Sequence, residues 1–458
     1  MPIQFRSRFP LALVGAAILA TTATPSGAAD PPARHRVAQA GPDRVASPST
    51  AAGTALLVTS PEQAVALALA RAPILRSAEA GRQVAQGDRV TAGLRPNPDF
   101  SFNAENIGGS GSYGGIRSLE TTYSLSQRIE TGGKRQARMT AADRAVALTS
   151  LDVEAVRLDL AREVVRALAE AVASGRAVEI ARERVRLADE VLRATRARVE
   201  AGREAFPQQR RAEVARETAA VFAERSQREA GSALRTLSVL LATPGVDVMA
   251  ARATWFDDLG PRPAPTRAAA LPPGQLDRTR LDALIDQRRA ELDLQRRNAI
   301  PDVAVGGGVR RFREASGDTA FVLGLSVPLP IFDRNQGNIL RAGAELNRAE
   351  AEAERGRLYL DASLADAERR LDQAWRAADS LRRVVLPAAG EAAASAREGY
   401  AGGKFSLLEV LDAQRALSDA REQLNAALLE VQQVRADIAR LRGRAATPAS
   451  TPAAATRQ

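Results

Sequence analysis

The sequence predicts a mainly α-helical chain with a small β part, built as two copies of one unit. Long stretches carry apolar residues every three or four positions, which is the period of a helix, and four short stretches alternate apolar and polar residues, which is the period of a strand. Motifs that recur about 200 residues apart set the architecture. The paired segments are Asn97–Phe102 and Ile300–Val305, Leu125–Ser126 and Leu325–Ser326, and Val199–Arg203 and Tyr400–Lys404.

The composition agrees with long helices. Of the 458 residues, 45% are apolar and only 4% are aromatic, and Ala, Arg, Glu and Leu dominate each copy. The formal net charge is +10. Because Arg alternates with Glu and Asp, no continuous basic stripe forms, so we expect solvated helical faces and no nucleic-acid partner.

The N-terminus, residues 1–29, is typical of a secretory signal peptide. Arg6 and Arg8 precede an apolar run, Leu11–Ala20, that is followed by small residues. This run of about ten residues is too short to span a bilayer as a helix, which needs about 20 residues. A single anchor helix is the alternative. Residues 30–59 are rich in Pro, Ala and Ser and are expected to form a disordered arm. The absence of Cys excludes disulfides and a lipid attachment site.

The first copy is expected to span residues 60–245. A helix capped by Ser60 breaks at Pro73 and resumes to about Gly93. Alternating residues then predict a hairpin with a long glycine-rich turn, with strands at 100–105 and 119–126. The segment from Lys134 to Ala201 contains no proline and would form a helix roughly 100 Å long, and a second helix follows to Leu241.

Residues 246–275 are expected to form a linker, and residues 276–443 the second copy. Its strands are predicted at 302–311 and 320–327. A helix of about 60 residues then reaches Gly399, with an interruption at Pro387. A last helix follows Gly403, and residues 444–458 are expected to be a disordered tail.

The strands put Phe, Val, Leu and Tyr on one face and Ser, Thr, Asn and Glu on the other. Membrane barrels carry apolar residues outside and polar residues inside, and a sheet in lipid must close so that no edge is left unpaired. The smallest bacterial barrels have about eight strands, so four strands require several chains to share one barrel. Two soluble hairpins packed on helices are the alternative. The helices would line a tube, or else form a coiled coil without a lumen.

Taken in order, several motifs resemble the TolC family of outer-membrane efflux proteins, and the resemblance covers about residues 60–443. Two of them are most similar to the CzcC-type branch, which serves heavy-metal efflux. The supporting segments are Pro61–Ala68, Pro98–Asp99, Pro301–Asp302, Leu125–Arg135 and Pro328–Gly337.

The resemblance implies a homotrimer in the outer membrane of a Gram-negative bacterium, with a large periplasmic part. Each chain would give four strands to a twelve-stranded barrel in lipid and its helices to a periplasmic helical barrel. A resistance-nodulation-division pump of the inner membrane and a periplasmic adaptor protein would feed this passive duct, which needs no cofactor.

The resemblance also implies a gate. Glu409 and Asp412 match the positions of the family's acidic iris and, spaced i,i+3, share one helix face. Three-fold symmetry would gather six carboxylates into a ring that attracts cations. The first copy carries Gln208 and Arg211 at the matching places, so Arg211 is expected to pair with an acid of the second copy. Without the resemblance, both acids would be ordinary surface residues.

The turns between the long helices are the expected adaptor contacts. They contain Gly202 and Arg203 in the first copy, and Gly402, Gly403 and Lys404 in the second. Glycine allows the tight reversal between two antiparallel helices, and simple turn geometry is the alternative explanation of each.

A periplasmic adaptor and an enzyme are the alternatives to the duct. A periplasmic adaptor has one helical hairpin and compact β domains, and it lacks the doubled strand pairs. An enzyme is disfavoured because the chain has one His, His35, and no Cys, so we expect neither a catalytic residue nor a His/Cys metal site. The cargo stays open between heavy-metal cations and drugs or other organic compounds.

Overall fold

The computed structural model describes residues 56–248, 253–263, 271 and 275–444. The predicted signal peptide, most of the arm and the tail lie outside these residues. The helices are α1 Pro61–Arg71, α2 Pro73–Gly93, α3 Lys134–Glu200, α4 Phe206–Leu240, α5 Thr254–Asp257, α6 Leu276–Asn298, α7 Gln336–Ser380, α8 Leu386–Ala401 and α9 Leu407–Leu441. The strands are β1 Leu56–Val58, β2 Asp99–Glu105, β3 Glu120–Ile129, β4 Val246–Val248, β5 Val303–Phe312 and β6 Thr319–Ser326.

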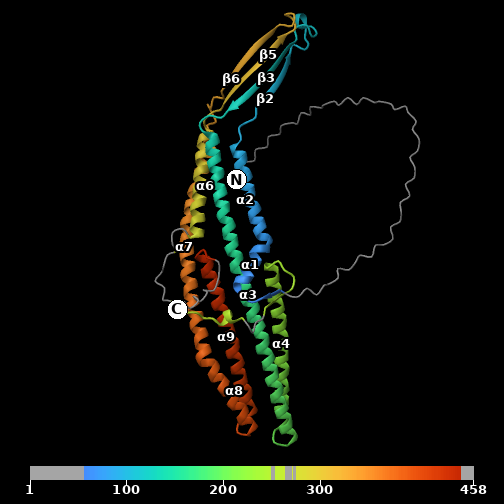
Figure 1. The fold of residues 1–458 in the computed structure, drawn as a ribbon, viewed down its shortest axis with the longest axis vertical. Coiled ribbons are helices and arrows are strands. Elements are labelled where there is room, and N and C mark those ends of the chain that lie inside the picture. Colours follow the sequence, from blue (N-terminus) through green and yellow to red (C-terminus); the bar gives the residue numbers. More distant parts are fainter. Residues whose placement is uncertain (1–55, 249–252, 264–270, 272–274, 445–458) are drawn as a thin grey trace, which may run out of the picture. The chain divides into compact units, whose positions relative to one another are not determined.

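The helix α3 is the element against which both copies pack (Figure 1). It contacts α1, α2 and α4 of its own copy and α6 and α9 of the second. At 67 residues it would extend about 100 Å. No proline interrupts it, and it ends just before Gly202, as predicted.

The second copy replaces this single helix by two. Between α7 and α8 the chain makes a π-helical turn, Leu381–Val385, in which the Leu386 N–H bonds the Leu381 carbonyl. Pro387 lies at the start of α8, and proline has no N–H to continue the α-helical ladder. The predicted interruption is therefore confirmed.

The predicted strand pairs and long helices are confirmed to within a few residues, and the described parts of the predicted arm and linker contain short regular elements. Leu56–Val58, at the end of the predicted disordered arm, forms β1 and pairs in parallel with β4. The linker contains β4 and α5. The alternation over three residues is too short to be recognised in the sequence.

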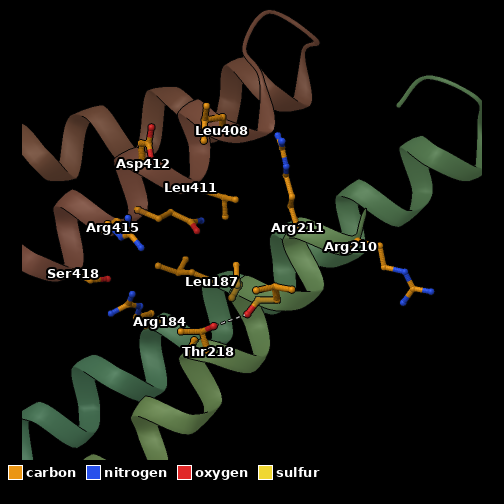
Figure 2. Close-up of a pocket in the computed structure, with 15 residues that line it drawn as sticks. Arg184, Leu187, Arg210, Arg211, Thr218, Leu408, Leu411, Asp412, Arg415 and Ser418 are labelled. Atoms are coloured by element: carbon orange, nitrogen blue, oxygen red, sulfur yellow. Dashed lines mark hydrogen bonds between the residues drawn. The ribbon is translucent and has the colours of Figure 1, made fainter. Parts of the chain in front are cut away.

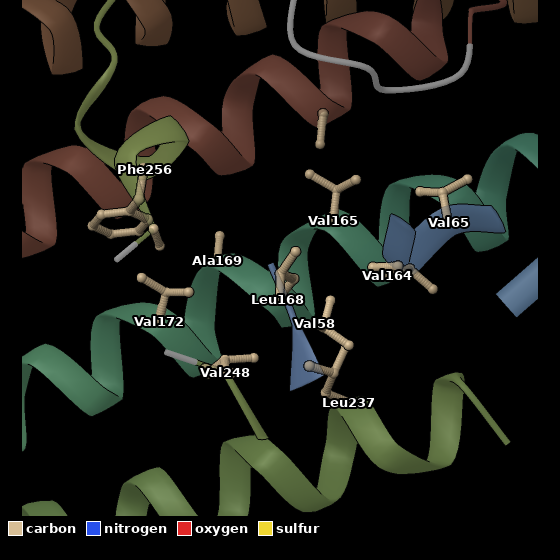
Figure 3. Close-up of a cluster of buried hydrophobic side chains, with 14 of the residues drawn as sticks. Val58, Val65, Val164, Val165, Leu168, Ala169, Val172, Leu237, Val248 and Phe256 are labelled. Carbon is tan, nitrogen blue, oxygen red and sulfur yellow. The ribbon is translucent and has the colours of Figure 1, made fainter. Parts of the chain in front are cut away.

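These short elements close the main hydrophobic core (Figure 3). Val58 of β1, Val248 of β4 and Phe256 of α5 pack on the buried face of α3 around Leu168. Phe256 is fully buried. The Gln432 amide of α9 donates to the carbonyls of Trp255 and Phe256, both at 3.1 Å, which satisfies backbone groups that the linker cannot pair itself.

The four longer strands form one antiparallel sheet in the order β2-β3-β5-β6 (Figure 1). The two copies therefore join through β3 and β5, from Glu120 opposite Phe312 to Ile129 opposite Val303. The outer strands β2 and β6 each have one edge without a partner in the described chain.

The register of the sheet separates an apolar face from a polar one. Phe100 lies opposite Leu125, and Phe102 opposite Tyr123, so the apolar rows continue from strand to strand. Their side chains are exposed, up to 95% for Phe321. On the other face Ser101 and Ser124 share a hydrogen bond of 2.7 Å between their hydroxyls. The predicted polarity of the strands is thus confirmed.

The polar face is the concave one, as two neighbouring glycines of β5 show. A Cβ on Gly308 would clash with the Tyr123 carbonyl and lie 2.8 Å from the Ser124 Cβ, whereas a Cβ on Gly307 would meet only the Val322 carbonyl, at 3.9 Å. Side chains converge on the inside of a curved sheet and diverge on the outside. The curvature therefore places the serine and glycine face inside and the aromatic face outside.

A salt bridge joins the sheet to the helices. The Lys134 ammonium at the start of α3 lies 2.6 Å from the Asp302 carboxylate at the start of β5, with only 10% of the lysine side chain exposed. The Thr131 N–H donates to the same carboxylate at 3.2 Å. The strand-entry motif of the second copy is thus tied to the point where the first copy changes from strand to helix.

The two faces of β5 provide a matched pair of substitutions. Gly308→Ala should lower the melting temperature of the purified protein and the yield of folded protein, because overpacking costs about 1–3 kcal/mol. Gly307→Ala adds the same methyl group on the open face and should leave both quantities unchanged. Equal behaviour of the two variants would contradict the assigned curvature.

Candidate functional site

The two helical tips have the same backbone structure. Gly202 and Gly403 adopt left-handed φ angles of 68° and 77°, a conformation that favours glycine. The predicted turn role is confirmed for these two residues, whereas Gly402 has an ordinary helical φ of −77° and contributes no left-handed turn. The matching bonds are Gly202 N–H to Val199 O and Arg203 N–H to Arg198 O, and Gly403 N–H to Tyr400 O and Lys404 N–H to Gly399 O.

A buried contact that the sequence analysis missed holds the tips together. The Tyr400 hydroxyl of α8 lies 3.0 Å from the Thr195 hydroxyl of α3, and both side chains are buried. The Arg198 guanidinium lies 4.7 Å from the centre of the Tyr400 ring and donates to the Tyr400 carbonyl at 2.9 Å. The sequence contains one indication of this contact, because a tyrosine such as Tyr400 in an apolar position needs a partner for its hydroxyl, although the sequence does not identify that partner.

Glu409, one of the two predicted gate acids, has a local structural role. Its carboxylate accepts the Ser406 N–H at 2.6 Å, and its own N–H donates to the Ser406 hydroxyl at 3.4 Å, which together form a capping box at the start of α9. The Ser406 N–H, and then its hydroxyl, lower the pKa of Glu409. The carboxylate is therefore engaged by its own helix, which the i,i+3 spacing of Ser406 and Glu409 already allowed.

Asp412 and Arg211, by contrast, line one groove near the tips, between α3 and α4 on one side and α9 on the other (Figure 2). The groove has a volume of about 490 Å³. Its charged lining residues are Arg184, Arg210, Arg211, Arg415 and Asp412, so arginines outnumber acids four to one.

No ion pair joins Arg211 to Asp412 in the part of the chain described, and Arg211 makes a single long hydrogen bond of 3.5 Å to Gln208. Both side chains are exposed, as are Arg203 and Lys404 at the tips. Among the described residues, no three His, Cys, Asp or Glu side chains gather closely enough to hold a metal ion.

A known protein family matches both copies of the chain. The outer membrane efflux protein family matches residues 64–239 and again residues 280–444. The chain belongs to this family. The two matched segments each contain one strand pair with its long helices, and the members of this family are outer-membrane transport proteins.

Two relatives and two solved structures extend the comparison. The chain is 30% identical to the cobalt-zinc-cadmium resistance protein CzcC of Cupriavidus metallidurans, over 86% of this chain and 94% of that protein. It is 30% identical to the nickel-cobalt-cadmium resistance protein NccC of Alcaligenes xylosoxydans xylosoxydans, over 69% and 72%. The fold matches VceC of Vibrio cholerae with a TM-score of 0.69 at 18% identity, covering 84% and 96% of the chains, and CusC with 0.69 at 18%, covering 84% and 92%.

Within residues 56–248, 253–263, 271 and 275–444, none of the helices combines the length and apolar character that crossing a bilayer requires.

Proposed function

We propose that this chain forms the outer-membrane duct of a tripartite efflux system and that its cargo is a heavy-metal cation such as cobalt, zinc or cadmium. The proposed cargo rests on the similarity to CzcC, which extends over nearly the whole of both chains. An inner-membrane pump of the resistance-nodulation-division class supplies the energy, and a periplasmic adaptor connects the pump to the duct.

Three copies of the chain complete the duct. One chain gives four strands, with an apolar convex face and two free edges, and three chains give twelve strands. Closure by neighbouring copies would pair the edges of β2 and β6, which lipid cannot solvate. The concave faces, rich in Ser and Gly, would then surround an aqueous lumen.

The helical tips form the entrance. Arg211 and Asp412 line the same groove without bonding each other in one chain, so each is available to a neighbouring copy. We assign the gate to these two residues, with Glu409 fixing the start of α9. The exposed tips, with Arg203 and Lys404 beside their glycines, are the surface offered to the adaptor.

The cargo can be tested by deletion. Loss of the gene should lower the concentrations of cobalt, zinc and cadmium that inhibit growth, and a plasmid-borne copy should restore them. A deletion strain that becomes sensitive only to organic dyes and drugs would contradict the proposed heavy-metal cargo but would still agree with an efflux duct. Unchanged sensitivity to every compound would contradict both.

The gate can be tested in planar bilayers. Arg211→Glu should raise the single-channel conductance, because a carboxylate would repel the Asp412 of the neighbouring copy and loosen the mouth. The double variant Arg211→Glu/Asp412→Arg should return toward the wild-type value.

Arg225→Glu is the control for the gate experiment, since Arg225 lies on the same helix and pairs with Glu229 at 2.8 Å, outside the groove. An unchanged conductance of Arg211→Glu would remove Arg211 from the gate.

A further inference from the structure

A cluster of charged side chains lies on the concave face of the sheet, at the end far from the helices. Glu105 ends β2, Glu120 begins β3, and Arg310 lies near the end of β5. The opposite end of β3, at Ile129, leads within five residues into α3 at Lys134. The cluster is therefore separated from the start of α3 by the length of the strands, and the helical tips lie at the other end of α3.

The contacts in this cluster are specific. The Arg310 guanidinium lies 3.3 Å from the Glu120 carboxylate and 3.8 Å from that of Glu105. It also donates to the Thr122 hydroxyl at 3.1 Å, and Thr122 is buried. Asn106 donates to Glu120 at 3.5 Å.

Two acidic side chains lie directly opposite each other in this cluster. Glu105 and Glu120 are direct cross-strand partners, and like charges in that position destabilise a sheet. Arg310 lies close to both and offsets their repulsion. Within the cluster itself, the two carboxylates and one guanidinium sum to a charge of −1 per chain. A purely structural site would need no excess acid, because a neutral pair would satisfy the same geometry.

We propose that Glu105, Glu120 and Arg310 of three copies form a charged ring at the exit of the duct that determines its preference for cations over anions. The inference rests on the proposed trimeric duct, which turns the concave face toward a water-filled lumen. Rings of acidic side chains select cations in channels, and a unit charge at about 8 Å in water changes the local concentration of a monovalent ion roughly twofold.

The two kinds of substitution predict opposite effects. Glu105→Gln makes the ring neutral, so the potassium-to-chloride permeability ratio, obtained from the reversal potential in a salt gradient, should fall. Arg310→Gln leaves −2 per chain, so the ratio should rise. Both shifts should shrink in high salt, which screens charges in water.

Arg311→Gln is the matched control. Arg311 is the next residue of β5, so it lies on the convex face, and the same change of charge there should not move the permeability ratio. Glu105 is the more exposed acid and makes the longer contact with Arg310, so Glu105→Gln keeps the inference testable where Arg310→Gln fails to assemble.

The outcomes separate this inference from the proposed function. Wild-type protein that forms no channel in a planar bilayer overturns the proposed duct, and the ring with it. Channels whose permeability ratio is unchanged in Glu105→Gln, or shifts as much in Arg311→Gln, overturn the ring and leave the duct in place. Opposite shifts in Glu105→Gln and Arg310→Gln, with none in Arg311→Gln, support it.

Discussion

The two outer edges of the sheet carry backbone N–H and C=O groups that no strand of the described chain pairs, and the need to pair them governs how the chain assembles. The pairing of β3 with β5 joins the copies and satisfies the inner edges, but β2 and β6 each keep one edge open within the described chain. In hydrocarbon each unpaired backbone group costs several kcal/mol. A sheet with an exposed aromatic face and open edges is therefore incomplete as a single chain, and the family to which the chain belongs gives the context in which copies complete it.

Below the sheet, polar contacts between the copies set the relative positions of long helices whose buried residues are often alanine. Lys134 bonds Asp302 at the junction with the strands, and Arg198 stacks on Tyr400 at the tips. Between them, Arg440 of α9 lies 2.7 Å from both Asp159 of α3 and Asp277 of α6. Burial of the Arg440 guanidinium lowers its pKa, but the hydrogen bonds that it donates to these two carboxylates outweigh this effect and raise the pKa above the ordinary value. Small alanine side chains interlock little, so packing alone defines the axial alignment of neighbouring helices weakly. These directional polar contacts therefore specify that alignment.

The sequence predicted the elements that local chemistry controls. Period-two alternation located β2, β3, β5 and β6, and the prolines and glycines located the ends of the long helices and the interruption before α8. It did not predict β1, whose three residues acquire their conformation by pairing with β4 nearly 200 residues away. It also did not predict the capping role of Glu409, which bonds a neighbour three residues away, or the groove of α3, α4 and α9 that Asp412 lines. The contact of Tyr400 with Thr195 spans 205 positions, and no local pattern encodes it.

The number of chains in one particle decides whether neighbouring copies pair the open edges. The protein should be purified in mild detergent, and the mass of its protein component measured by light scattering or native mass spectrometry. We expect three chains per particle, in a form that makes conducting pores when reconstituted in lipid. A stable single chain that forms no pore would contradict it, because a lone four-stranded sheet would then satisfy its own edges in some other way.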